Sequence, residues 1–215
     1  MAAYEERYVC FIDILGFSSA TKDQSHPCYN YGPDFLRQAL RGLRSMGDPD
    51  MALIGVKLNQ FSDCVALSSP ILDQDLHMFL LRTMNVQQYL IRGKLPTRGA
   101  ITKGLLYHDD SGCIFGPALV EAVELEKKYA KFPRVILAPN VLGSINFNTS
   151  SSLIGYDSDF SYVKYIENWC SINTEQEIAS LGEFISNGLT YEDKSKRAKY
   201  EWLDQKYKEL IYCPY

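Results

Sequence analysis

An apolar run near the start of the chain reads Val9-Cys10-Phe11-Ile12-Asp13-Ile14-Leu15-Gly16-Phe17-Ser18. From Tyr8 to Ile12 the side chains are β-branched, aromatic or sulfur-bearing, which predicts a buried central strand with both faces covered. Asp13 would then stand at the C-terminal edge of this strand, where it could hold a divalent cation or simply cap a following helix. Gly16 and Phe17 predict a tight turn whose backbone N–H groups approach a phosphate.

Composition restricts the class of protein. The chain has 215 residues, 46% of them hydrophobic and 22% charged, as in an ordinary soluble globular protein. Its net charge of −4 argues against a nucleic acid polymer as partner. No apolar run is long enough for a membrane span, and the N-terminus lacks the pattern of a signal peptide. The six cysteines are scattered and form no C-x-x-C pair, which predicts reduced thiols and a cytoplasmic protein.

Hydrophobic periodicity and turn residues predict the order of the elements. Strands are expected at 8–12, 53–61, 64–68, 98–107, 113–115 and 134–138, with an edge strand at 160–166, and helices at 34–46, 73–92, 118–130, 174–187 and 192–211. The stretch 21–33 is expected to be a loop, and the lysines of the last helix predict a solvated face.

This order predicts an α+β fold, a ferredoxin-like βαββαβ plan with an added hairpin and C-terminal helices. We expect one domain over residues 1–215, with a core of about 7–138 and an extension of about 139–215.

Two carboxylates carry the predicted chemistry. In this plan the first strand lies beside the first hairpin, so Asp13 at a strand end and Asp63 at the hairpin tip can converge. Together with the backbone carbonyl of Ile14 they suit Mg²⁺ or Mn²⁺ with positions left for substrate phosphates. Such a site could activate a hydroxyl nucleophile and neutralise a leaving pyrophosphate. A metal-dependent phosphohydrolase or a polymerase-like palm enzyme could use the same pair.

The motifs resemble those of the class III nucleotidyl cyclases over roughly residues 7 to 138. The resemblance lies in four segments that occur in the family's order: Phe11-Ile12-Asp13-Ile14-Leu15-Gly16-Phe17, Ser62-Asp63, Arg98-Gly99-Ala100-Ile101-Thr102-Lys103-Gly104 and Cys113-Ile114-Phe115-Gly116. In size and in its RGAI-type strand the chain resembles the bacterial anti-phage pyrimidine cyclases of the Pycsar systems.

The resemblance implies a role for individual residues. Asp13 and Asp63 would bind two Mn²⁺ or Mg²⁺ ions per site with the Ile14 carbonyl. The backbone of Gly16 and Phe17 would contact the triphosphate, and Arg98 would meet the phosphates. The positions that read the base fall on Asn59 and Cys113. The site would lie at the interface of a homodimer, and a separate effector protein would read the product in anti-phage defence.

The chain departs from the family at two places. An adenylyl cyclase is expected to have Lys and Asp at the base-reading positions and a guanylyl cyclase Glu and Cys, so Asn59 with Cys113 matches neither. An uncharged amide suits uracil or cytosine, but an amide that can flip does not choose between them. UTP is therefore the preferred substrate from the commoner product of the family, giving cyclic UMP, with CTP as the alternative.

The second departure concerns transition-state stabilisation. Val120 and Glu124 stand where the family places an Asn and an Arg. Arg98 or Lys103 would then have to stabilise the charge on the α-phosphate, and Lys164 is a candidate for the terminal phosphate. A catalytically silent nucleotide-binding protein would also tolerate Val120 and Glu124.

Overall fold

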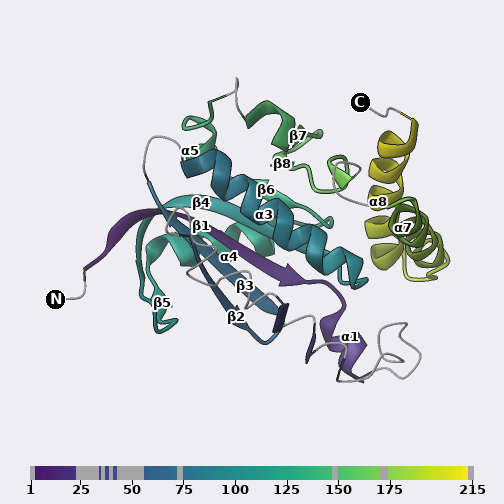
Figure 1. Cartoon of the computed structure of the whole chain (residues 1–215), viewed down its shortest axis with the longest axis horizontal. Coiled ribbons are helices and arrows are strands. Elements are labelled where there is room, and N and C mark those ends of the chain that lie inside the picture. The colour runs from purple at the N-terminus through teal and green to yellow at the C-terminus, as the bar shows by residue number, and fades with distance from the viewer. Residues whose placement is uncertain are drawn as a thin grey trace.

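The computed structural model describes residues 3–22, 34, 37–38, 41–42, 56–71, 75–146, 150–169 and 174–212 (Figure 1). The first half of the chain forms β1 (Glu5–Ile14), α1 (Phe17–Lys22), β2 (Lys57–Phe61), β3 (Cys64–Pro70) and α3 (Asp75–Arg92). It continues with β4 (Thr97–His108), β5 (Ile114–Phe115), α4 (Pro117–Tyr129), β6 (Val135–Leu137) and α5 (Pro139–Leu142). The last part forms η3 (Ser151–Leu153), β7 (Ile154–Tyr156), β8 (Ser161–Val163), α7 (Glu175–Gly188) and α8 (Lys194–Tyr212).

The strands form one mostly antiparallel sheet in the order β2-β3-β1-β4-β6-β8-β7, with β5 paired to β4. β1 lies between β3 and β4 and is antiparallel to both, whereas β4 and β6 are parallel. The first four strands in this order follow the βαββαβ plan, so the predicted α+β fold with an added hairpin and C-terminal helices is confirmed.

Both faces of β1 are covered, which explains its nearly continuous apolar sequence. Tyr8, Cys10, Ile12 and Ile14 belong to the main core, together with α3. Val9 packs on the opposite face in a smaller cluster that contains Ala118 and Ala122 of α4. Figure 1 shows α3 and α4 on opposite sides of the sheet. Asp13 shares the face of Val9 because side chains alternate along a strand.

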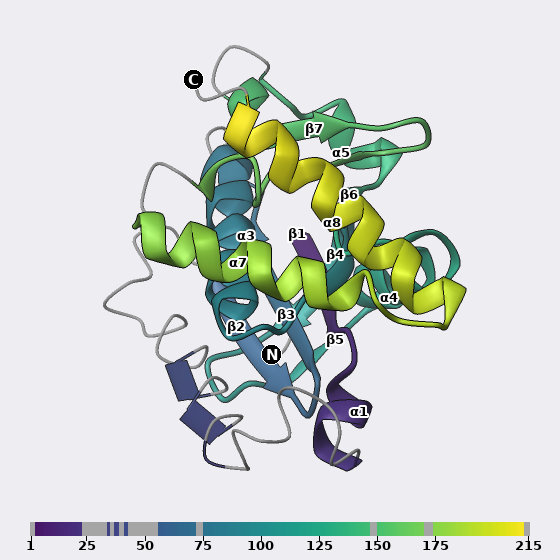
Figure 2. The same cartoon turned by 90° about the vertical axis from the view of Figure 1, so that its right-hand side faces the viewer.

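The C-terminal part adds two strands and two helices to this core. β8 pairs with β6 on one side and with β7 on the other, so the prediction of an edge strand at 160–166 is wrong and β7 is the outer strand. α7 begins with the predicted capping box between Thr174 and Glu177. α8 is anchored by the buried side chains Trp202, Leu203 and Leu210. Figure 2 shows α7 and α8 crossing one another.

Some predicted elements fall on parts of the chain that the structure does not describe. Of the helix expected at 34–46, only positions 34, 37, 38, 41 and 42 are described, and these are helical. Most of the loop expected at 21–33 and the start of the strand expected at 53–61 lie outside the described residues. Among the helices that are described, none combines the length and the apolar character needed to cross a bilayer.

Candidate active site

Asp13 and Asp63 line one cavity of about 370 Å³. The pairing of β1 with β3 places Asp13 opposite Cys64, and the backbone N–H of Ile14 donates to the Asp63 carbonyl at 2.9 Å. The hairpin between β2 and β3 therefore ends beside the last residues of β1. Both aspartates are held at this end of the sheet by backbone pairing.

Cys64, the first residue of β3, lies close to acidic side chains of the cavity and of α4. Burial, followed by the charges of Asp63, Asp13 and Glu126, raises its pKa to about 12. A thiol senses carboxylates only at short range in this way, because each charge disfavours a second negative charge nearby. Contacts agree with this, because Cys64 Sγ lies 3.9 Å from Asp63 Oδ1 and one guanidinium, that of Arg98, contacts both Asp13 and Glu126.

The turn after β1 also lines the cavity through Ile14, Leu15, Gly16 and Phe17. Gly16 has a φ of 76°, a left-handed conformation that residues with a Cβ adopt at a cost. The N–H of Leu15 donates to the carbonyl of Pro96 at 2.8 Å, which fixes the turn against the start of β4. The structure thus brings Gly16 and Phe17 to the cavity, as the sequence predicts.

Arg98 lies between two carboxylates at the same cavity. Its Nε donates to Asp13 Oδ2 at 2.9 Å and contacts Glu126 Oε1 at 2.8 Å. Burial raises the pKa of Glu126, and the charge of Arg98 opposes this shift. Sequence reasoning missed Glu126, although its spacing of four from Ala122 and eight from Ala118 would have placed it on the buried face of α4.

The C-terminal helix supplies a second wall that was not predicted. Lys196, Lys199, Tyr200 and Leu203 of α8 line the cavity, together with Tyr191 just before the helix. The lysine-rich face of this helix is therefore only partly solvated, and Lys206 is itself buried. The prediction of a solvated face holds for Lys194, Lys196 and Lys208 and is wrong for Lys199 and Lys206. These two are covered because the helix packs against the rest of the domain, a placement that its own sequence does not encode.

Two predicted phosphate contacts are not brought to the cavity within one chain. Lys103 lies five residues beyond Arg98 on β4, roughly 17 Å along the strand, and its Nζ donates to Ser144 Oγ at 2.7 Å. Lys164 directly follows β8, where its N–H and carbonyl bond to Leu153 and Asn168. Neither residue is among those that line the cavity.

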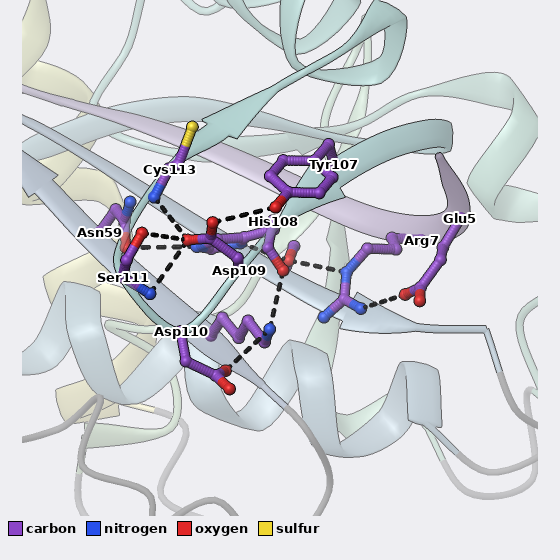
Figure 3. Close-up of polar contacts among 11 residues, drawn as sticks. Glu5, Arg7, Asn59, Tyr107, His108, Asp109, Asp110, Ser111 and Cys113 are labelled. Atoms are coloured by element: carbon purple, nitrogen blue, oxygen red, sulfur yellow. Dashed lines mark hydrogen bonds and ion pairs between the residues drawn. The ribbon is translucent and has the colours of Figure 1, made fainter. Parts of the chain in front are cut away.

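The two predicted base-reading residues, Asn59 and Cys113, come together at the turn between β4 and β5 (Figure 3). Asp109 Oδ1 accepts hydrogen bonds from the hydroxyl of Ser111 and from the N–H groups of Cys113 and Ser111, and these bonds, that of the hydroxyl first, lower the pKa of Asp109 to about 2. Asn59 Nδ2 donates to the carbonyl of Gly112. Asn59 and Cys113 do not line the cavity that holds Asp13 and Asp63.

A buried hydrogen-bond chain fixes the Asn59 amide. Arg7 Nε donates to Ser68 Oγ at 2.9 Å, Ser68 Oγ lies 2.7 Å from His108 Nδ1, and His108 Nε2 lies 3.2 Å from Asn59 Oδ1. Burial and the charges of Arg7 and Lys57 lower the pKa of His108 to about 4, so the imidazole is neutral at pH 7. The Gly112 carbonyl can only accept, so it takes the Asn59 amino group and leaves Asn59 Oδ1 facing His108 Nε2. The proton of the neutral imidazole therefore lies on Nε2, and Ser68 donates to Nδ1.

This protonation pattern removes the ambiguity of a free amide. The N–H at Nε2 requires the Asn59 oxygen on its own side, and the Gly112 carbonyl requires the Asn59 amino group on the other. The amide that the sequence leaves free to flip is therefore held in one orientation.

The positions at which the resemblance implies a transition-state Asn and Arg lie on the outer face of α4. Val120 is 57% exposed and Glu124 is also exposed, and neither lines the cavity. Within one chain they have no contact with the paired aspartates through which they could act.

The acidic pair fits one type of metal site. Mg²⁺ and Mn²⁺ prefer oxygen ligands and commonly complete their shells with phosphates and water. Within the described part of the chain, no group of three or more His, Cys, Asp or Glu side chains could hold a metal ion. Asp13 and Asp63 therefore fit a cation that is shared with a phosphate-bearing ligand, and they do not form a closed protein cage.

The comparisons with known proteins give similarity of fold alone. No family model matches the sequence, and no curated protein matches it. One similar solved structure is a bacterial light-regulated adenylyl cyclase, with 17% identity and a TM-score of 0.49, covering 68% of this chain and 46% of that one. Another is a class III adenylyl cyclase-like ATP-binding protein from Pseudomonas aeruginosa, with 12% identity and a TM-score of 0.43, covering 66% of this chain and 35% of that one. The chain thus spans less than half the length of either protein.

Proposed function

We propose that this protein is a metal-dependent nucleotidyl cyclase that converts UTP to 3′,5′-cyclic UMP and pyrophosphate. The observation that carries the proposal is the convergence of Asp13 and Asp63 on one cavity, with Arg98 hydrogen-bonded to Asp13. Paired carboxylates beside cationic side chains suit a triphosphate and its divalent cation.

In the proposed reaction the ribose 3′-oxygen forms a bond to the α-phosphorus, and the bond from that phosphorus to the β-phosphate oxygen breaks. The hydroxyl proton passes to solvent and pyrophosphate leaves. Asp13, Asp63 and the carbonyl of Ile14 would hold Mn²⁺ or Mg²⁺, which when bound lowers the pKa of the 3′-hydroxyl and neutralises phosphate charge. The protein's own contribution is positioning and electrostatic stabilisation.

The separation between the two halves of the site supports a homodimer. Asp13 and Asp63 line the cavity, whereas Asn59 and Cys113 lie together elsewhere on the same chain. In a head-to-tail dimer the aspartates of one chain would bind the triphosphate, and Asn59 and Cys113 of the other would contact the base. The uncharged Asn59 amide favours a pyrimidine over a purine in this proposal, with CTP as the alternative to UTP. The cyclic nucleotide would serve as a second messenger for a separate effector in anti-phage defence.

The deciding experiment incubates the purified protein with each of the four nucleoside triphosphates and Mn²⁺ and identifies the products by mass. We expect cyclic UMP and pyrophosphate in equal amounts. A linear monophosphate or diphosphate would indicate a phosphohydrolase instead. Unchanged triphosphate in all four reactions would indicate a silent nucleotide-binding protein and would refute the cyclase.

A further inference from the structure

Among the residues that the structure describes, four cationic side chains line the cavity, and they differ in their partners. Arg98 lies between Asp13 and Glu126, so two carboxylates offset its charge. Lys94 Nζ donates to the carbonyl and the hydroxyl of Ser180, each at 2.6 Å. Lys196 lies over the ring of Tyr191, with its Nζ 5.7 Å from the ring centroid.

The fourth cationic side chain of the cavity is Lys199, and its environment differs from that of the other three. Its side chain is partly buried at the cavity, and the charged groups that act on it are Arg98, Asp193, Asp13 and Lys196. Burial lowers its pKa, and the positive charge of Arg98 lowers it further. Among the described residues, no hydrogen bond or salt bridge holds its ammonium group. Asp193 and Asp13 attract the ammonium group without forming a salt bridge to it among the described residues, and a ligand oxygen would supply the hydrogen bond that burial takes from it.

α8 holds Lys199 in a defined position. The next residue, Tyr200, packs its ring against Phe184 at 5.4 Å and Tyr191 at 5.5 Å between centroids. Trp202 and Leu203 then enter the core, and the ring of Trp202 meets Tyr162 edge-on at 5.5 Å. The backbone that carries Lys199 is therefore fixed against both α7 and the sheet, so Lys199 lines the cavity without any rearrangement of the helix.

We propose that Lys199 binds the phosphate groups of the ligand in this cavity, so that α8 provides an anion-binding residue for a site whose carboxylates lie on β1 and the β2–β3 hairpin. The identity of the ligand as a nucleoside triphosphate rests on the proposed function, whereas the anion site rests on the cavity and its charges. Lys199 thereby takes the role in phosphate binding that the sequence had suggested for Lys164.

The test titrates inorganic tripolyphosphate with equimolar Mg²⁺ into the full-length protein by calorimetry. Lys199→Gln keeps the apolar stem and removes the charge, and we expect it to weaken binding by about tenfold or more, the usual effect of losing a charge-assisted hydrogen bond. Lys199→Arg should bind within about threefold of the parent. Lys208→Gln is the matched control, because Lys208 lies on the same helix, is 61% exposed and pairs with Asp204.

The outcomes separate this inference from the proposed function. Equal tripolyphosphate affinity in the parent and Lys199→Gln, or no binding by the parent, would overturn the role of Lys199. Binding that depends on Lys199 without a cyclic product from any of the four triphosphates would support the anion site and refute the cyclase. If the cyclase is active, Lys199→Gln should raise the KM for UTP, whereas Lys208→Gln should leave KM and kcat unchanged.

Discussion

Asp13 on β1 and Arg98 on β4 are direct cross-strand partners, and the Arg98 Nε donates to Asp13 Oδ2 at 2.9 Å. The same nitrogen lies 2.8 Å from Glu126 Oε1, and the Glu126 side chain is almost fully buried. Arg98 therefore links the candidate metal ligand to an acid inside the domain. Because both carboxylates depend on one guanidinium, a substitution of Arg98 affects stability as well as the site.

Arg98→Ala should lower the free energy of unfolding by about 2–3 kcal/mol, because it leaves Glu126 buried without its cation. Urea denaturation measures this loss. Adding Glu126→Gln to Arg98→Ala should recover part of it, because the amide carries no charge. Arg197→Ala removes a largely exposed pair with Glu201 and should change stability by no more than about 0.5 kcal/mol. Similar losses in Arg98→Ala and Arg197→Ala would contradict the linking role of Arg98.

Asp13→Asn and Asp63→Asn should each reduce formation of cyclic product by about a hundredfold or more, because an amide is a much weaker ligand for a hard divalent cation. Product should also disappear with a chelator and return when Mn²⁺ is added in excess. Asp159→Asn changes an exposed acid outside the cavity and serves as the control. Full activity of either cavity variant would show that the two aspartates do not share a metal site.

Stability should depend on pH through His108. Its pKa in the folded protein is about 4, below the ordinary value of 6.5, so the unfolded chain binds the proton more readily. The stability that this group contributes is therefore complete above pH 6.5 and is lost as the pH falls towards 4, by about 3 kcal/mol in total. Urea denaturation between pH 7 and pH 4 measures the effect, and His108→Gln should flatten that part of the profile. An unchanged profile in this variant would exclude His108 as its source.

Asn59→Asp should alter the buried hydrogen-bond chain in a measurable way. A carboxylate beside His108 favours the imidazolium, so the pKa of His108 should rise from about 4 towards or above its ordinary value, as NMR titration would show. The same carboxylate cannot donate to the Gly112 carbonyl, so the turn that holds Cys113 should loosen. In an active cyclase the ratio of cyclic UMP to cyclic CMP should change. A His108 pKa that stays near 4 would mean that the two side chains do not interact.

Cys113 should react with iodoacetamide much faster than Cys10 or Cys64. Cys113 is exposed, whereas burial raises the pKa of Cys10 and, with the nearby acids, raises that of Cys64 to about 12. Peptide-resolved mass spectrometry measures the three rates. UTP with Mn²⁺ should protect Cys113 if this residue contacts the base in a dimer. Equal modification with and without nucleotide would remove Cys113 from the proposed site.

The pattern of the sequence was sufficient for most of the fold. The apolar run before Asp13 identified a strand covered on both faces, and the order of strands and helices predicted the βαββαβ sheet. Such patterns succeed because burial and backbone pairing repeat along a strand or helix and leave a local signature. The same reasoning placed Asp13 and Asp63 at the ends of elements that a known plan brings side by side.

The sequence by itself thus determined the βαββαβ part of the sheet, the buried β1 and the pair of acids at its end. Only the tertiary structure decided that α8 brings Lys199 to the cavity and that Lys103 and Lys164 lie away from it. It also decided that a neutral His108 fixes the Asn59 amide. The physical reason is that these contacts join residues far apart in the chain, through helix docking and a proton arrangement that no local periodicity records. From sequence alone, a charged helix face is predicted to be solvated. Which of its side chains are covered depends on the surface that the helix packs against.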